Sequence, residues 1–330
     1  MSKPRIAFIT GGLSGEAEIS YKSAVTIQSN IDTGKYEVYR IDIRHDGWWY
    51  SNEDGTESRV DKNDFSIRLN NQRLKFDAAL IGIHGTPGED GRLQGYLDMV
   101  GVPYGTCGHT ASAITFNKRY AVAVAAFSGI NVAKSFHYFS EDSIDYNALE
   151  KSLSFPVFVK PANGGSSIGM SKVAEPSGLP AAVEKALAED DQVLIEEEIK
   201  GREFTIGVFR KEGEIIALPM TEVKSLNYFF DFEAKYKGKN IETTPAEVDE
   251  HRAEKIREAA RRIYAIFNCN GVIRIDFIYS EEKDEPFMLE VNTIPGQSEA
   301  SLVPVQVQLY GLSLKEFYGS LIEDALKRKK

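Results

Sequence analysis

The sequence predicts an α/β protein, α+β overall, and three observations lead to this class. Over about the first hundred residues, short apolar runs alternate with helix-forming segments. In the middle of the chain, a strand-like run leads into the glycine-rich segment FVKPANGGSSIGMSKV. Near the C-terminus, two strand-like runs alternate between apolar and polar residues, as strands with one buried face do.

The first unit begins with an apolar strand at residues 6–10, which leads into a glycine turn and a helix start in GGLSGEAEIS. YEVYRIDI and FDAALIGIHG are two further strand-like runs. HTASAITFNKRYAVAVAAF is rich in helix formers, and we expect one helix there with Thr110 as its N-cap. Strands that alternate with helices in this way predict a mainly parallel sheet.

Two more units follow without a long linker or a repeat. PVFVK and QVLIEEEI predict strands on either side of the helix-forming LPAAVEKALAEDD, and EFTIGVF and IIALPM predict two more. Ser313 and Glu316 have the spacing of a capping box at the start of the last helix. The helix HRAEKIREAARRIYAIF should bury the face formed by Ile256, Ala260, Ile263 and Phe267.

Composition limits the classes of partner. The 330 residues include 39 Lys and Arg against 49 Asp and Glu, a net charge of −10 that disfavours a long surface for duplex nucleic acid. Two cysteines, Cys107 and Cys269, make no disulfide framework and favour a reducing compartment, so we expect both as small buried residues. The start MSKPRIAFIT is too short and too polar for a signal peptide, and no apolar run approaches membrane-spanning length. We therefore expect a cytoplasmic protein.

The first glycine segment, TGGLSGE, does not fit a dinucleotide fingerprint. That fingerprint needs G-x-G-x-x-G, and Gly11, Gly12 and Gly15 lack its spacing. Glu16 would also stand where a pyrophosphate binds, which disfavours NAD and hydride transfer. Two interpretations stay open: a tight strand-to-helix turn, or a turn that binds a substrate carboxylate and leaves Glu16 to pair with an amine.

The second glycine segment is not a Walker A loop, because its lysine precedes the glycines. Backbone N–H groups of NGGSSIG could surround phosphate oxygens, and Lys160 would add a positive charge to the same anion. The alternative is a plain hairpin loop with the lysine in solvent. The segment taken alone leaves both interpretations open.

The acidic hairpin GVIRIDFIYSEEKDEPFMLEVNTIPG favours the phosphate interpretation. Ile273, Ile275 and Phe277 should share one face of its first strand, with Phe287, Leu289 and Val291 on the matching face of the second. Met288, Glu290 and Asn292 then take the other face of the second strand, and pairing the apolar faces puts Arg274, Asp276, Glu290 and Asn292 on one common surface. Two carboxylates and an amide oxygen suit Mg²⁺ or Mn²⁺ rather than zinc. A merely polar face of an antiparallel sheet is the alternative.

These motifs together resemble the D-alanine–D-alanine ligases of the ATP-grasp superfamily. GGLSGEAEIS, HGTPGEDGRLQG, FNKR, VKPANGGSSIGMSKV, LIEEEIKGREFT, FEAKY, RIDF and LEVNTIPGQSEASLVP occur in that family's order and cover nearly the whole chain. The resemblance implies an ATP-grasp fold with an N-terminal Rossmann-like substrate domain (1–105). A central subdomain with the glycine loop (106–196) and a C-terminal subdomain with the metal site (197–330) follow.

The resemblance also implies an activity and a set of contacts. The family joins two D-alanines by way of a D-alanyl phosphate, giving the dipeptide for peptidoglycan precursors, ADP and phosphate. The implied nucleotide contacts are Lys118, Lys160, Gly164, Gly165, Ser167 and Lys235 at the phosphates, Glu196 and Ile199 at adenine, and Glu203 at the ribose. The implied substrate contacts are Glu16, His84, Arg274, Gly296 and Ser301, with Ser166 and Tyr236 in a hydrogen-bonded set with Glu16. The implied ligands of two Mg²⁺ or Mn²⁺ ions are Asp276, Glu290 and Asn292.

Two departures from the family pattern affect details. Glu197 and Glu198 stand where some relatives have a lysine and an aromatic residue, so the side-chain contact to adenine stays open. Ala300 replaces a histidine that some relatives carry before the residue matching Ser301. Alternatives are a ligase that joins D-alanine to D-lactate or D-serine, or a non-catalytic nucleotide-binding module. A homodimer is implied by the resemblance alone.

Overall fold

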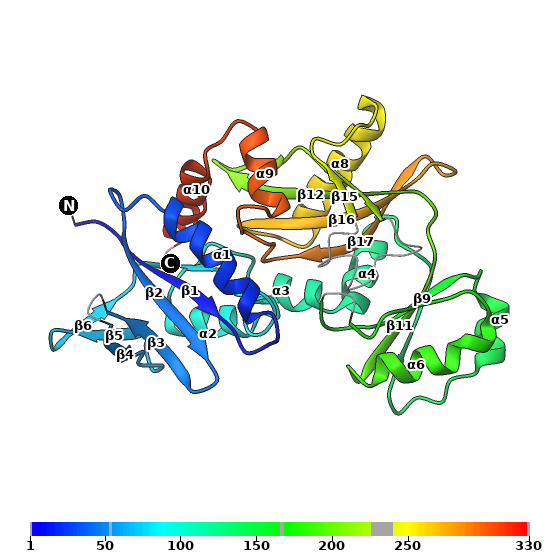
Figure 1. Ribbon diagram of the computed structural model, residues 1–330, viewed down its shortest axis with the longest axis horizontal. Helices are drawn as coiled ribbons and strands as arrows, with labels where there is room; N and C mark the ends of the chain where they lie inside the picture. Colours follow the sequence, from blue (N-terminus) through cyan, green and yellow to red (C-terminus); the bar gives the residue numbers. More distant parts are fainter. Residues whose placement is uncertain (1, 53–54, 166–167, 226–239, 329–330) are drawn as a thin grey trace.

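The computed structural model describes residues 2–52, 55–165, 168–225 and 240–328. Four of the predicted site residues, Ser166, Ser167, Lys235 and Tyr236, lie outside these ranges. Figure 1 shows the N-terminal elements at one end of the molecule and a small sheet with α5 and α6 at the other. A larger sheet formed by the last third of the chain lies between them (Figure 1).

The N-terminal sheet has the order β4-β3-β2-β1-β7, and only its β2-β1-β7 part is parallel. The prediction of a mainly parallel sheet was therefore half wrong, because β3 and β4 continue it as an antiparallel meander. A short β5-β6 hairpin lies beside it. The bounds are β1 Arg5–Gly11, α1 Ala17–Asn30, β2 Glu37–Arg44, β3 Gly47–Ser51, β4 Glu57–Arg59, β5 Ser66–Leu69, β6 Gln72–Lys75, β7 Ala78–Ile81 and α2 Arg92–Val100.

The middle of the chain forms a sheet of order β10-β9-β11-β8, with every pair antiparallel. Helix α6 packs on β9 and β11, and the glycine segment connects β9 to β10. The bounds are β8 Ser135–Phe139, α5 Tyr146–Ser152, β9 Val157–Pro161, β10 Ser171–Val173, the short 3₁₀ helix Pro176–Gly178, α6 Leu179–Leu187 and β11 Gln192–Glu197.

The helical segment before this sheet is two helices, not one. Helix α3 runs over His109–Phe116 and α4 over Lys118–Phe127, and Asn117 separates them with extended backbone angles. The N-cap prediction for Thr110 was wrong, because Thr110 lies inside α3 and Gly108 precedes that helix. The break has a local cause: the Asn117 side chain accepts a hydrogen bond from the Tyr120 N–H and so starts a second helix.

The C-terminal sheet has the order β15-β14-β12-β16-β17, with β13 paired to β12. Helix α8 covers one face, where the predicted apolar residues of that helix are buried, and α9 packs on β12 from the other side. The predicted capping box starts α10. The bounds are β12 Arg202–Lys211, β13 Glu214–Ala217, β14 Thr221–Ser225, β15 Asn240–Thr243, α8 Glu250–Ile266, β16 Val272–Ser280, β17 Glu285–Asn292, α9 Leu302–Leu309 and α10 Leu314–Lys327.

A bulge changes the predicted faces of the acidic hairpin. The register of β16 and β17 pairs Asp276 with Glu290 but Phe277 with Met288, so Leu289 is the extra residue. Met288 is therefore buried in the core, while Leu289 turns toward a cavity, and the prediction had assigned them the opposite way. On the other side of the bulge, Arg274 pairs with Asn292 and Asp276 pairs with Glu290, so these four residues share one surface as predicted.

The cores do not follow the order of the chain. Residues of α3 and α4 pack with the C-terminal sheet and α8, whereas α10 packs with α1, β1 and β7 of the N-terminal sheet. Cys107 and Cys269 are both buried and not disulfide-bonded, as expected. None of the helices in the described ranges combines the length and apolar character that crossing a bilayer requires.

Candidate active site

Two cavities meet where the three larger sheets come together. A cavity of about 720 Å³ lies between the middle and C-terminal sheets, and one of about 280 Å³ lies between the C-terminal sheet and the N-terminal loops. Seven residues line both cavities and form the boundary between them: Lys118, Gly164, Gly165, Glu242, Arg274, Glu290 and Leu302. A ligand in one cavity can therefore touch a ligand in the other.

The larger cavity collects the predicted nucleotide residues that the structure describes. They come from α4, from the glycine segment, from β9, β11 and β12, and from the connection between β11 and β12: Lys118, Lys160, Gly164, Gly165, Glu196, Ile199 and Glu203. Inside it Lys160 and Glu196 form an ion pair, and both side chains are largely buried. The Glu196 carboxylate is therefore paired with Lys160 in this structure.

Lys118 reaches the boundary between the cavities from the first turn of α4. Its Nζ donates to the Gly164 carbonyl at 2.6 Å and lies 4.0 Å from Glu290 Oε2. The lysine thus sits between the glycine segment and the acidic hairpin. A phosphate at this boundary would meet its positive charge directly.

The polar face of the hairpin is organised around Asp276. Arg274 donates to it in a bidentate pair, Nε to Oδ1 at 2.9 Å and Nη2 to Oδ2 at 2.8 Å. The Thr205 hydroxyl, directly opposite on β12, donates to the same carboxylate. Asn292 Nδ2 lies 3.4 Å from Asp276 Oδ2, and Arg274 Nη2 lies 3.9 Å from Glu290 Oε1. Burial lowers the pKa of the Arg274 guanidinium, but the attraction of Asp276 and Glu290 outweighs it and leaves that pKa raised.

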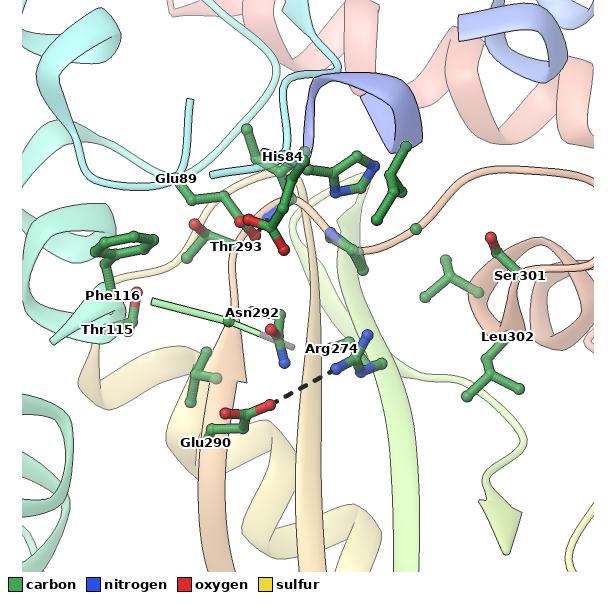
Figure 2. Close-up of a pocket in the computed structure, with 18 of the residues that line it drawn as sticks. His84, Glu89, Thr115, Phe116, Arg274, Glu290, Asn292, Thr293, Ser301 and Leu302 are labelled. Atoms are coloured by element: carbon green, nitrogen blue, oxygen red, sulfur yellow. Dashed lines mark hydrogen bonds and ion pairs between the residues drawn. The ribbon is translucent and has the colours of Figure 1, made fainter. Parts of the chain in front are cut away.

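These residues fit a hard divalent cation by the chemistry of their oxygens. Asp276 and Glu290 face each other across the β16–β17 pair. Figure 2 shows the side chains of Asn292 and Glu290 beside Arg274. Asp276 Oδ1 accepts from both Arg274 and Thr205 and Oδ2 accepts from Arg274, so a cation bound here would share this carboxylate with those donors. Within the described ranges no three His, Cys, Asp or Glu side chains gather into a cation-binding group. Asn292 would supply an amide oxygen as the third donor of such a site.

The smaller cavity collects the predicted substrate residues. Glu16, His84, Arg274, Gly296 and Ser301 all line it. In Figure 2, His84 lies above the hairpin, and Ser301 lies to one side at the start of α9. The structure therefore brings together residues that are up to 285 positions apart in the sequence, as 301 minus 16 gives.

His84 is held in place from helix α1. Its Nε2 is 2.9 Å from Ser23 Oγ, and its backbone N–H donates to Ser20 Oγ at 2.9 Å. Ser23 Oγ also accepts from the Gln297 N–H at 3.1 Å. The helix thus fixes both the histidine and the loop that carries Gly296.

Glu16 lies against glycines from two different loops. A Cβ at Gly165 would stand 3.0 Å from Glu16 Oε1, and one at Gly85 would stand 2.7 Å from Glu16 Oε2. Neither loop can carry a larger residue there unless the carboxylate moves. Glycine at position 165 thus lets the glycine segment approach Glu16 closely.

Glu89 is a site residue that the sequence reasoning missed. Its Oε2 accepts from the Gly85 N–H at 2.8 Å and its Oε1 from the Ile294 N–H at 3.3 Å, so it joins two loops of the smaller cavity. Burial raises the pKa of the Glu89 carboxyl to about 7, with a smaller contribution from Glu16, although the two N–H donors oppose the shift. The motif HGTPGEDGRLQG contains it, but nothing in that motif separates it from Asp90 beside it.

Two family models, for the N-terminus and the C-terminus of D-ala D-ala ligase, match residues 5–107 and 117–323. The chain belongs to the D-alanine–D-alanine ligase family. It is 44% identical to the D-alanine–D-alanine ligase of Parabacteroides distasonis over 328 residues, which cover 99% of each chain.

Solved structures of this ligase family agree with the fold. The D-Ala:D-Ser ligase VanG of Enterococcus faecalis is 30% identical, with a TM-score of 0.86 over 98% of this chain and 99% of that one. The D-alanine–D-alanine ligase of Bacillus anthracis, solved as a complex with ATP, is 26% identical, with a TM-score of 0.79 over 99% and 98%. The ATP-grasp fold expected from the sequence is therefore confirmed.

Proposed function

We propose that this protein joins two D-alanine molecules to D-alanyl-D-alanine at the expense of ATP, for peptidoglycan precursors. Membership of the ligase family over nearly the full chain supports this function. The single structural observation that carries it is the boundary shared by the two cavities. There Lys118, Arg274 and Glu290 stand between a space large enough for a nucleotide and a space large enough for two amino acids.

The first step activates the carboxylate of the first D-alanine. A carboxylate oxygen attacks the γ-phosphorus of ATP, the bond from that phosphorus to the β–γ bridging oxygen breaks, and ADP leaves. Phosphoryl transfer depends chiefly on positioning and charge neutralisation. In this proposal Lys118 and Lys160 hold phosphate oxygens, and Glu16 holds the ammonium group of the first D-alanine. The divalent cations, when bound by Asp276, Glu290 and Asn292, would supply further neutralisation of the phosphate charge.

The second step forms the peptide bond. The amine of the second D-alanine, after losing a proton, attacks the acyl carbon, and the bond to the phosphate oxygen breaks. Arg274 and the Gly296 N–H would stabilise the oxyanion, and one such donor is typically worth about 3–4 kcal/mol. Ser301 would orient the carboxylate of the second substrate. Since an acyl phosphate hydrolyses in water, the close packing of Gly165 on Glu16 helps to protect it.

A coupled product assay tests the function. The protein is incubated with MgATP and D-alanine, and released phosphate and dipeptide are measured in the same sample. Equal amounts of the two products are expected, with little phosphate release when D-alanine is left out. Phosphate without dipeptide, or no ATP turnover, would refute the proposal.

D-Serine or D-lactate as second substrate is the alternative. The likeness to a D-Ala:D-Ser ligase gives D-serine a specific basis. Competition between equal concentrations of D-alanine, D-serine and D-lactate, read by mass spectrometry, separates the three. A preference for either competitor at neutral pH would replace the dipeptide assignment.

Other parts of the proposal depend on the family resemblance. They are two Mg²⁺ or Mn²⁺ ions per site, a homodimer and a cytoplasmic location. The residue assignments outside the described ranges, Ser166, Ser167, Lys235 and Tyr236, belong with them. The same holds for the division into domains at 1–105, 106–196 and 197–330. Metal titration, light scattering and cell fractionation test the first three.

A further inference from the structure

A row of polar side chains joins the turn after α6 to the start of α4 beside the larger cavity. Asp190 Oδ2 accepts from the backbone N–H of Asn163 at 2.8 Å and from its Nδ2 at 3.0 Å. Asn163 Oδ1 accepts from Asn117 Nδ2 at 3.0 Å, and Asn117 Oδ1 accepts from the Tyr120 N–H at 3.2 Å. Of these residues only Asn163 lines the cavity.

The direction of this row is fixed at one end by Asp190. A carboxylate can only accept, so the NH₂ group of Asn163 must face it and the Asn163 oxygen must face away. That oxygen in turn attracts the NH₂ group of Asn117, which leaves the Asn117 oxygen toward the helix. This is the orientation in which Asn117 can cap α4. Asn117 Nδ2 also donates to Gln192 Oε1 at 3.3 Å, so Asp190, through Asn163, and Gln192 together support this orientation of Asn117.

The hydrogen bonds of Lys118 lie beside this row. The Lys118 backbone N–H donates to the Ala162 carbonyl at 2.8 Å, and its Nζ donates to the Gly164 carbonyl at 2.6 Å. These two carbonyls belong to the residues on either side of Asn163. Lys118 is also the first residue of α4, directly after its cap. A displacement of Asn163 would thus disturb the cap and both carbonyl partners of Lys118 together.

We propose that Asp190, acting through Asn163 and Asn117, is a positioning residue that holds Lys118 and Gly164 against the nucleotide phosphates. The inference rests on the proposed function, which places phosphates at Lys118. Asp190 itself does not line either cavity, so its effect must pass through the asparagines. The row consists of hydrogen bonds among Asp190, Asn163 and Asn117 beside Lys118, and it does not include Ile199 or Glu203, the residues proposed for adenine and ribose. The effect should therefore be confined to phosphate-bearing ligands.

The test compares binding of ADP and of adenosine to full-length protein by calorimetry in the presence of Mg²⁺. Asp190→Ala should raise the dissociation constant of ADP about tenfold, while that of adenosine changes less than about twofold. In steady-state assays the KM for ATP should rise and the KM for D-alanine should stay within about twofold. Glu189→Ala removes an exposed carboxylate from the same turn and is the matched control, with no change expected.

Asp190→Asn is the second variant, and it also serves as the test if Asp190→Ala fails to fold. It keeps one accepting oxygen but turns an NH₂ group toward the donors of Asn163, so a smaller loss of ADP affinity is expected. Equal losses for ADP and adenosine, or an unchanged dissociation constant for ADP, would overturn the proposal. If the parent protein itself binds adenosine as tightly as ADP, the assignment of phosphates to Lys118 is wrong, and this inference is wrong with it.

Discussion

The carboxylates of Asp276 and Glu290 should differ sharply in their contribution to the free energy of unfolding, although the sequence predicts the same polar face and the same role for both. Arg274 and Asp276 are paired with side chains only 16% and 14% exposed, and Asp276 also accepts from Thr205. Asp276→Ala leaves the Arg274 charge buried without its main partner, which typically costs about 3–5 kcal/mol. Glu290 is 32% exposed and lies 3.9 Å from Arg274, so Glu290→Ala should cost about 0–1 kcal/mol.

The assay is urea unfolding of the metal-free proteins in EDTA, followed by fluorescence. Glu285→Ala is the control, since Glu285 is an exposed carboxylate on the same strand, 3.5 Å from Lys255. Both Asp276→Ala and Glu290→Ala should lose turnover, because both are proposed cation ligands, so stability is the property that separates them. Losses of unfolding free energy that agree within about 0.5 kcal/mol, or a larger loss for Glu290→Ala, would refute the reasoning.

Three further predictions concern single contacts. Gly165→Ala places a Cβ against the Glu16 carboxylate, so the KM for D-alanine should rise about tenfold, and unchanged initial-rate kinetics would contradict this contact. Burial raises the pKa of Glu89 from 4.5 to about 7, so its stabilising contribution is complete below pH 4.5 and is lost as the pH rises to 7. Relative to the parent, metal-free Glu89→Gln should therefore gain unfolding free energy across that window, by up to about 3 kcal/mol, and a flat difference would argue against the shift. Gln306→Ala removes the acceptor of the Gly207 N–H and should cost about 2–4 kcal/mol in urea unfolding, whereas exposed Gln308→Ala on the same helix should change less than about 0.5 kcal/mol.

The shared polar face of the hairpin could be predicted from the sequence because the two patterns that produce it are local. Alternation along each strand assigns Arg274 and Asp276 to one face, and pairing of the apolar faces brings Glu290 to them. The bulge at Leu289 could not be predicted in the same way. One extra residue reverses the faces beyond it, and only the packing of Met288 into the core decides where it is placed.

Other features depend on contacts between distant parts of the chain. The break at Asn117 is stabilised from Asn163, which lies 46 residues away, so a window of helix-forming residues cannot reveal it. The raised pKa of Glu89 arises from burial beneath the Ile294 loop, 205 residues away. Propensity and spacing describe neighbours in sequence, and both of these features are set by neighbours in space.

The position of α10 has a consequence for how the protein is made. Ile6, Phe8 and Leu80 of the N-terminal sheet share one core with Phe317 and Leu321 of the final helix. During synthesis the N-terminal sheet leaves the ribosome well before α10, the helix that covers this face. Shortening the chain by those residues would expose apolar surface at the opposite end of the sequence, so a C-terminal truncation should aggregate through its N-terminal strands.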